Sequence, residues 1–143
     1  MRPRRGGAAM TPEADDRTPG PPERTASDSS GALPPTANPY ARTYPNGPFT
    51  VVEVSGEIDL ATAAFLAEHL DAATSRPGPD VLVDLRHVGF FDCSGLRELC
   101  RADTRARERG GRLRLVSDTP RLHRLLRAAR LLHRFPPLAR IPE

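Results

Sequence analysis

The stretch Val88-Gly89-Phe90-Phe91-Asp92-Cys93-Ser94-Gly95-Leu96 decides how the rest of the sequence is interpreted. An apolar strand end leads directly into the polar turn Asp92–Gly95, and a helical pattern follows at once. An acid, a thiol, a hydroxyl and a glycine therefore stand at a helix N-terminus. Unpaired backbone N–H groups and the positive end of the helix dipole favour an anion or a phosphorylated side chain there. Function is predicted to reside at this turn.

Before the turn, the sequence predicts a hairpin followed by a helix. A short edge strand is expected at 40–44, and Asn46-Gly47 is a hairpin signal that leads into a second strand at 49–55. A helix is expected from about 61 to 74, with Asp59 as its N-cap.

The remaining elements alternate between strand and helix. Val81–Leu85 is mostly apolar, as is typical of a central strand covered on both faces. The helix after the turn is expected to end at Gly110-Gly111, Arg112–Val116 alternates like a strand, and Thr119-Pro120 opens another helix. The order β-β-α-β-α-β-α predicts an α/β fold. Its helices would pack on a mixed, mostly parallel sheet of four to five strands.

Composition divides the chain into three parts. Residues 1–39 contain eight prolines and only three large apolar residues, too few to offset chain entropy, so they are predicted to be a disordered tail. A folded domain is expected at 40–138 and a short C-terminal tail at 139–143. About 100 residues suffice for one modest core.

Charge and cysteine content restrict the partners and the compartment. Cys93 and Cys100 would lie about 10 Å apart on one helix, too far to form a disulfide, so a reduced, cytoplasmic protein is expected. Eight arginines from Arg112 onward face only Asp118 and Glu143, which fits a solvated helix face or a surface for an acidic partner. Few aromatic residues argue against nucleic acid. No apolar run approaches the roughly 20 residues of a membrane span.

Neither catalysis nor metal binding has a convincing pattern. A nucleophilic Cys93 would need a base, and the four histidines form no recognisable Cys/His signature with it: His69, His87, His123 and His133. A thiol-dependent enzyme is therefore only a remote alternative. The scattered cysteines and histidines lack the spacing of metal ligands, so no catalytic residue, metal or cofactor is predicted.

Four motifs in order and at matching spacing resemble the STAS domain, most closely the stand-alone bacterial anti-sigma factor antagonist. They are Gly56-Glu57-Ile58-Asp59, Val83-Asp84-Leu85, Phe91-Asp92-Cys93-Ser94-Gly95-Leu96 and Gly110-Gly111-Arg112-Leu113. The resemblance covers roughly residues 49–135.

The resemblance implies a monomeric, non-enzymatic regulator. Such proteins dock on an anti-sigma factor, usually a serine kinase with a histidine-kinase-like ATPase fold, and docking releases the sigma factor. The resemblance places partner binding at Glu57 and Asp59 in an acidic loop and at the turn Asp92–Gly95, which comprises Asp92, Cys93, Ser94 and Gly95. In the family, phosphorylation of the serine after the turn's aspartate breaks the complex. Scaffold subunits of stress-signalling assemblies and small partners of lipid-transport ATPases resemble this domain too, and these roles remain alternatives.

This sequence departs from the family pattern at the switch. Cys93 occupies the phosphoserine position, and a thiol is not a substrate for a serine kinase; Ser94 keeps a hydroxyl one position later, about 100° around the helix. Three interpretations stay open. Cys93 packs as a near-isostere and the binder is unswitched, or Ser94 is phosphorylated instead, or Cys93 is a redox switch because helix N-termini favour thiolates. Asp92 disfavours a thiolate beside it.

A second departure lies near the C-terminus. The Gly-Leu pair that often closes the helix before the family's last strand is Arg130-Leu131 here, and the chain stops soon after Pro136-Pro137. The usual final helix is therefore expected to be missing.

Overall fold

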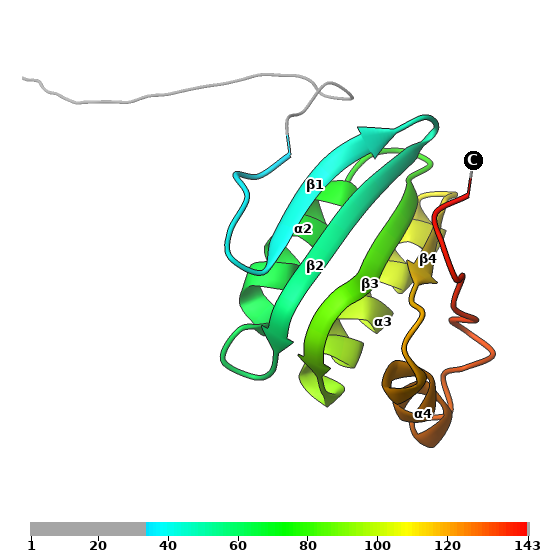
Figure 1. The fold of residues 1–143 in the computed structure, drawn as a ribbon. Coiled ribbons are helices and arrows are strands. Elements are labelled where there is room, and N and C mark those ends of the chain that lie inside the picture. Colours follow the sequence, from blue (N-terminus) through cyan, green and yellow to red (C-terminus); the bar gives the residue numbers. More distant parts are fainter. Residues whose placement is uncertain (1–33, 143) are drawn as a thin grey trace, which may run out of the picture. The chain divides into compact units, whose positions relative to one another are not determined.

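The computed structural model describes residues 34–142, so most of the expected tail at 1–39 lies outside the described residues. Within the described part, four strands and three helices follow the predicted β-β-α-β-α-β-α order, as Figure 1 shows. Their bounds are β1 Ala41–Asn46, β2 Phe49–Ile58, α2 Ala63–Ala73, β3 Asp80–Phe91, α3 Cys93–Glu108, β4 Arg112–Val116 and α4 Pro120–Ala128.

The sheet has the spatial order β1-β2-β3-β4. β1 is antiparallel to β2, whereas the β2–β3 and β3–β4 pairs are parallel. The hairpin predicted at Asn46-Gly47 is confirmed, because Asn46 pairs with Phe49 and Gly47 adopts a φ of 60°, which favours glycine. The sheet is therefore mixed and mostly parallel, as predicted, with four strands.

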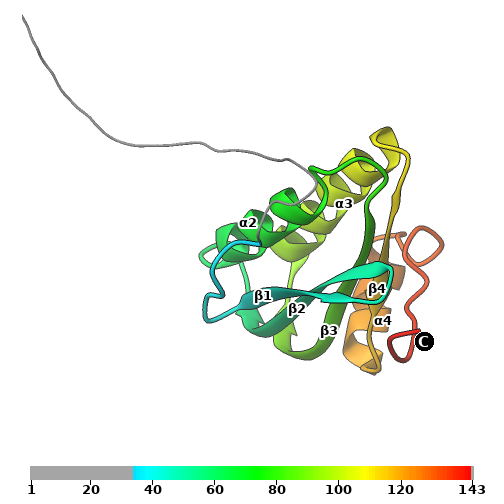
Figure 2. The same ribbon diagram turned by 90° about the horizontal axis from the view of Figure 1, so that it is seen from above.

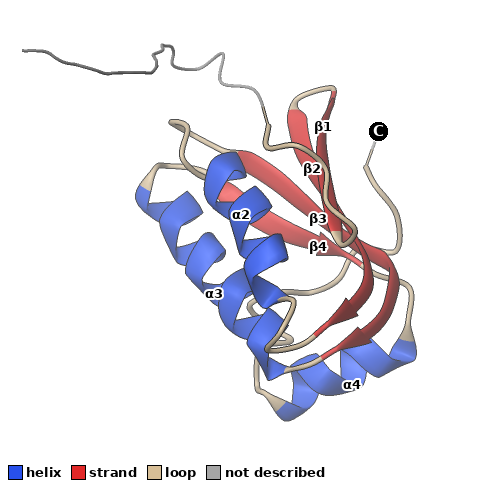
Figure 3. Ribbon diagram, turned by 90° about the vertical axis from the view of Figure 1, so that its left-hand side faces the viewer, coloured by secondary structure: helices blue, strands red, loops and turns tan. Residues whose placement is uncertain are grey.

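Two helices cover one face of this sheet. In Figures 2 and 3, α2 and α3 lie side by side over that face, and α4 lies near the end of the sheet at which β3 stops. The core between these layers is built from alternate strand residues and the apolar sides of the helices. Its fully buried members include Val52, Val54, Ile58, Leu66, Leu70, Val83, Leu85, Leu99, Leu115, Leu126 and Phe135.

The opposite face of the sheet carries a second, smaller apolar cluster. Val51, Leu82 and Val116 are buried there, and Leu138 and Ile141 from the C-terminal segment pack against them. Leu138 also forms an isolated parallel bridge with Val116 at the outer edge of β4. A single bridge therefore stands where a fifth strand would pair.

Both β1 and the segment before it are attached to α2 through His69, which is fully buried. Its Nδ1 lies 2.7 Å from the Thr43 hydroxyl, and its Nε2 lies 3.3 Å from the carbonyl oxygen of Thr36. Asn38 adds a hydrogen bond to the carbonyl of Phe65. The domain boundary expected at residue 39 remains a prediction.

Both later helices end in the same hydrogen-bond pattern. Gly110 has a φ of 78°, and the amide of Gly111 donates to the carbonyl of Ala106, so the predicted helix stop is a Schellman motif. At the end of α4, the amide of Leu131 donates to Leu126 in the same way. There the left-handed position is held by Arg130, with a φ of 62°. Arginine thus occupies a conformation that glycine adopts without strain.

The expected bounds of several elements need correction. β1 is Ala41–Asn46 rather than 40–44, and β2 continues three residues beyond its expected end at 55. Helix α2 begins at Ala63 and ends at Ala73, two residues later and one residue earlier than expected, and Thr62 is its N-cap. β3 continues six residues beyond Leu85, because its apolar stretch is extended by Val88 and Phe91, which pack against the core.

Candidate functional site

The acidic loop and the Asp92–Gly95 turn meet where β2 and β3 end. Glu57 pairs with Phe90 and Ile58 with Phe91 in the parallel register. Just beyond this pairing, the backbone amide of Asp92 donates a 3.2 Å hydrogen bond to the carbonyl of Ile58. The parallel strands therefore bring the residues of both predicted segments together at one edge of the sheet.

Asp92 is the N-cap of α3. Its backbone is extended (φ −120°, ψ −167°), and its Oδ1 accepts a 2.8 Å hydrogen bond from the amide of Ser94. One of the free amides of the first turn is thereby satisfied. The half-buried Asp92 thus positions the turn and carries a negative charge at its start.

The two switch candidates differ in exposure. Cys93 is exposed and has a free thiol, whereas Ser94 is half-buried and its amide is bonded to Asp92. Cys100 is also a free thiol and is half-buried on α3. Position 93 is therefore the more accessible of the two to a partner.

Gly95 lies against an aromatic ring. A Cβ built on Gly95 would come within 2.5 Å of Cζ of Phe91, closer than any ordinary contact. The buried glycine thus lets the last residue of β3 pack against the first turn of α3.

Asp59 has a structural task in addition to its charge. Its Oδ1 accepts hydrogen bonds from the amides of Ala61 (2.9 Å) and Thr62 (3.1 Å). The Thr62 hydroxyl in turn accepts from the Asp59 amide at 2.9 Å and donates to the carbonyl of Glu57 at 2.7 Å. The prediction that Asp59 is the N-cap of α2 is therefore wrong, because Asp59 caps the turn that precedes this helix. Glu57 remains exposed.

Exposed apolar side chains stand beside these loops, and the sequence analysis did not single them out. Leu60 is 79% exposed at the end of the acidic loop, and Phe90 is 43% exposed at the end of β3. Alternation along a strand was the available signal, because consecutive Phe90 and Phe91 cannot both face the same core. We define the docking surface as the loop Glu57–Leu60, Phe90 and the turn Asp92–Gly95.

A groove of about 520 Å³ adjoins the docking surface. It lies between the end of β3 and the N-terminal half of α4, and we call it the β3–α4 groove. Its lining includes Val88, Phe90, Phe91, Pro120, Arg121 and Arg124. Phe90 belongs to both the groove and the docking surface, so the two are continuous.

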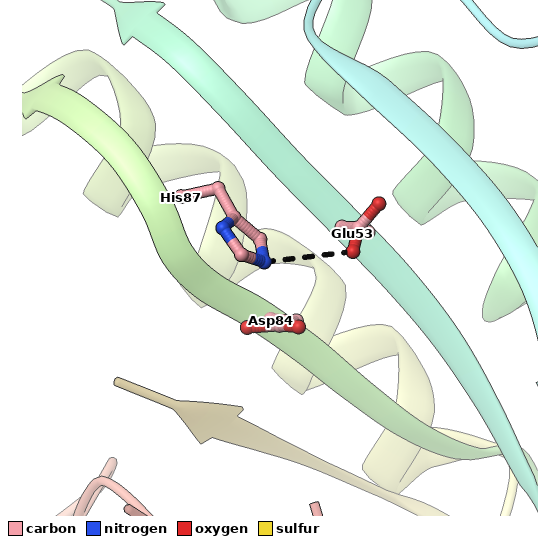
Figure 4. Close-up of side chains that lie close together, drawn as sticks. All are labelled: Glu53, Asp84 and His87. Carbon is pink, nitrogen blue, oxygen red and sulfur yellow. Dashed lines mark ion pairs between the residues drawn. The ribbon is translucent and has the colours of Figure 1, made fainter. Parts of the chain in front are cut away.

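A polar cluster on the sheet involves Glu53, Asp84 and His87 (Figure 4). His87 lies 3.7 Å from Glu53, which also pairs with Arg42 at 2.5 Å. Arg42 pairs with Oε1 of Glu53, and Arg86 bonds both carboxylate oxygens of Asp84, so both acids already have a cationic partner.

Asp84 is fully buried and forms two 2.9 Å hydrogen bonds with the guanidinium of Arg86. Burial alone would raise the pKa of Asp84, but hydrogen bonds from the side chain and backbone of Arg86, together with its charge, hold this pKa below its ordinary value. The pair is therefore structural and lies on β3 before the turn.

Comparisons with known proteins place this geometry. A family model described as "Mlab, STAS domain" matches residues 46–138. An anti-sigma factor antagonist from Mycobacterium paratuberculosis is 25% identical, with a TM-score of 0.63 over 71% of this chain and 86% of that chain. An anti-sigma-factor antagonist (STAS) domain protein from Planctomyces limnophilus is 23% identical, with a TM-score of 0.54 over 66% of this chain and 86% of that chain. No match was found among curated proteins.

Within residues 34–142, no helix combines the length and the apolar character needed to cross a membrane.

His87 is the histidine nearest in sequence to the turn, and its Nε2 lies 3.7 Å from Oε2 of Glu53 on the sheet. That the chain is not an enzyme stays a prediction.

Proposed function

The chain belongs to the STAS domain family, and we propose from this premise that it is an anti-sigma factor antagonist, which binds an anti-sigma factor and thereby frees a sigma factor. The observation that carries the proposal is that the acidic loop and the Asp92–Gly95 turn lie next to each other at the ends of β2 and β3. They are joined by the hydrogen bond between Asp92 and Ile58. The similar protein from Mycobacterium paratuberculosis bears the same functional description.

The docking surface has the composition of a protein-binding site. Leu60 and Phe90 expose apolar side chains, as is typical of a site that binds another protein. Glu57, Asp59 and Asp92 add negative charge to the same surface. The two carboxylates that cap backbone amides are held in place before a partner arrives. Such preorganisation lowers the entropic cost of binding.

The proposed partner is an anti-sigma factor with a histidine-kinase-like ATPase fold, bound by a monomer of this chain in the cytoplasm. We expect Cys93 to contact it, because Cys93 is exposed within the docking surface. A thiol there offers no acceptor for a serine kinase. We therefore propose a binder that the usual phosphorylation does not release. Phosphorylation of Ser94 and oxidation of Cys93 are the two outcomes that would replace this part of the proposal.

The test is affinity capture from a lysate of the source organism, with the wild-type chain and a Glu57→Lys variant compared. Recovery of a kinase-like anti-sigma factor by the wild type alone supports the proposal. Mg-ATP is then added, and the bait is analysed by mass spectrometry. Retention of the partner with an unmodified bait supports the unswitched binder, whereas release with a phosphate on Ser94 assigns the switch to Ser94. Equal recovery by both baits contradicts a docking role for Glu57.

A second candidate role is that of an accessory subunit of a lipid-transport ATPase or a stress-signalling scaffold. The observation that favours it is the thiol at position 93, since a constitutive subunit needs no kinase acceptor there. Capture of a transport ATPase or a large scaffold in the same experiment would establish this role and reject the antagonist.

A further inference from the structure

We propose that the β3–α4 groove receives a segment of the partner protein that carries an apolar side chain next to carboxylates. This inference rests on the proposed function, because the groove extends the docking surface through Phe90. It adds a specific recognition chemistry to that surface and assigns a role to the basic residues of α4.

The floor and walls of the groove are mostly apolar. Val88, Phe91 and Pro120 line it, and Phe90 forms an edge that is 43% exposed. Its volume of about 520 Å³ lies within the range of clefts that bind ligands, roughly 300–1,000 Å³. An apolar side chain that entered this groove would cover surface that is now in contact with water.

The charge at the rim of the groove determines which groups of the bound segment can lie beside its apolar side chain. Arg121 and Arg124 line the groove, and α4 contains no acidic residue. Arg121 uses one guanidinium nitrogen in a 2.8 Å hydrogen bond to the carbonyl of Gly89, which holds the side chain across the groove. Among residues 34–142, neither arginine forms an ion pair with a carboxylate, whereas Arg86, Arg105 and Arg134 each do.

The apolar lining and the basic rim of the groove together determine which kind of segment can bind in it. Guanidinium groups bind carboxylates through charge-assisted hydrogen bonds, so a segment with Asp or Glu beside Leu or Phe satisfies both the rim and the floor. On the β2 side of Phe90, the docking surface carries the acidic residues Glu57 and Asp59. A partner with an acidic segment at α4 and basic residues opposite the loop would therefore bind in only one orientation.

The test uses the full 143-residue chain and three short fluorescein-labelled peptides, with binding measured by fluorescence anisotropy. The first peptide, EDLFELLDEE, is acidic and apolar; the second replaces its acids with lysine, and the third replaces its Leu and Phe with alanine. The first peptide is expected to bind at least about tenfold more tightly than either control.

Matched charge reversals locate the binding. The variant Arg121→Glu/Arg124→Glu is expected to weaken binding of the acidic peptide at least about tenfold. The variant Arg76→Glu/Arg109→Glu makes the same change in net charge at exposed arginines outside the groove lining, and it is expected to leave binding within about twofold. Phe90→Ala tests the apolar edge and is expected to weaken binding. Circular dichroism verifies that each variant is folded.

Several results would overturn the inference. They are the absence of binding up to about 1 mM peptide, equal binding of the acidic and lysine peptides, or equal losses in the two double variants. Sedimentation that shows dimers dispersed by Arg121→Glu/Arg124→Glu would assign the groove to a second copy of the chain instead. The peptide test needs no anti-sigma factor. Loss of peptide binding with successful capture therefore rejects only the groove, and peptide binding without capture of an anti-sigma factor rejects only the proposed function.

Discussion

The ring of Phe91 occupies the space in which a side chain at position 95 would begin. A Cβ on Gly95 would lie 2.5 Å from Cζ and 2.7 Å from Cε2 of that ring. The glycine of the turn is therefore required by packing between the end of β3 and the start of α3. This contact positions the Asp92–Gly95 turn of the docking surface relative to the end of β3.

We expect Gly95→Ala to lower the free energy of unfolding by about 1–2 kcal/mol. Overpacking costs about 1–3 kcal/mol, and the better helix propensity of alanine returns less than about 1 kcal/mol. Urea denaturation followed by circular dichroism measures the change. Gly89→Ala is the control, because its Cβ would meet only the carbonyl of Gly56 at 3.8 Å.

A smaller side chain at position 91 should relieve part of this loss. In the Gly95→Ala background, Phe91→Leu is expected to cost less than it does in the wild type, by at least about 0.5 kcal/mol. Additive effects of the two substitutions would show that Phe91 is not what excludes a side chain at position 95.

Arg130→Gly is expected to stabilise the domain by about 1 kcal/mol. Arg130 has a φ of 62° at the end of α4, and a left-handed conformation costs a residue with a Cβ roughly 1–2 kcal/mol, of which the greater freedom of glycine in the unfolded chain offsets a part. The matched control Ala129→Gly, at a φ of −84°, should destabilise instead. Thermal and urea unfolding of both variants measure the difference. A loss of stability in Arg130→Gly would show that its side chain makes a contact worth more than the strain.

The order of elements followed from local signals in the sequence. Asn46-Gly47, Gly110-Gly111 and the helix start at Pro120 each determine their turn through nearby residues, and all three are confirmed. The β3–α4 groove could not be predicted in this way. It forms because Phe90 and Arg121 approach each other across 31 positions, and no periodicity within either element encodes that approach.

The predicted site residues divide in a similar manner. Their proximity follows from parallel pairing of β2 and β3, which the strand–helix–strand order implied. The capping roles of Asp59 and Asp92 within the site depend on where each turn begins, and α2 began two residues later than its apolar pattern indicated. Element ends are set by competing hydrogen bonds, here those of Thr62, and these are not visible in a pattern.

Removal of Arg86 should make stability depend on pH in a new way. The lowered pKa of Asp84 in the folded chain contributes stability above the unfolded-state pKa of about 3.9, and this contribution is lost as the pH falls through the folded-state pKa. In Arg86→Met, Asp84 stays buried but loses the hydrogen bonds and the charge of Arg86. The pKa of Asp84 therefore rises, and its charge destabilises the folded chain. We expect a loss of about 3 kcal/mol at pH 7.

The loss should diminish as the pH falls from the raised pKa of Asp84 in the variant toward its lowered pKa in the wild type, because only below the lowered value is Asp84 neutral in both folded proteins. Urea denaturation at a series of pH values measures it. The control Arg42→Met removes an exposed partner of Glu53 and should have only a small effect. A loss in Arg86→Met that is independent of pH would show that the arginine stabilises the fold through packing alone.

Ser94→Asp should weaken binding of the anti-sigma factor while the melting temperature changes little. A negative charge in the first turn of α3 is favoured by the helix dipole by about 0.3–1 kcal/mol, and repulsion from Asp92 offsets part of that. At the interface, the same charge adds to those of Glu57 and Asp59. Calorimetric titration of the captured partner measures the affinity, with Ser94→Asn as the uncharged control. Equal affinities for the two variants would remove Ser94 from the interface.

Cys93→Ser should convert the chain into a kinase substrate. Position 93 is exposed at the start of α3, and a hydroxyl differs from the thiol by one atom, so affinity without ATP should stay within a few-fold of the wild type. With the captured kinase-like partner and Mg-ATP, the variant should gain one phosphate on residue 93 and dissociate, because the added charge of about −1.5 to −2 lies within the acidic docking surface. Cys93→Ala keeps the exposure without an acceptor and should stay bound, as the wild type should. Phosphorylation of the wild type and of Cys93→Ala alike would place the acceptor at Ser94. A Cys93→Ser variant that binds but is never modified would show that the partner is not a kinase acting on this turn.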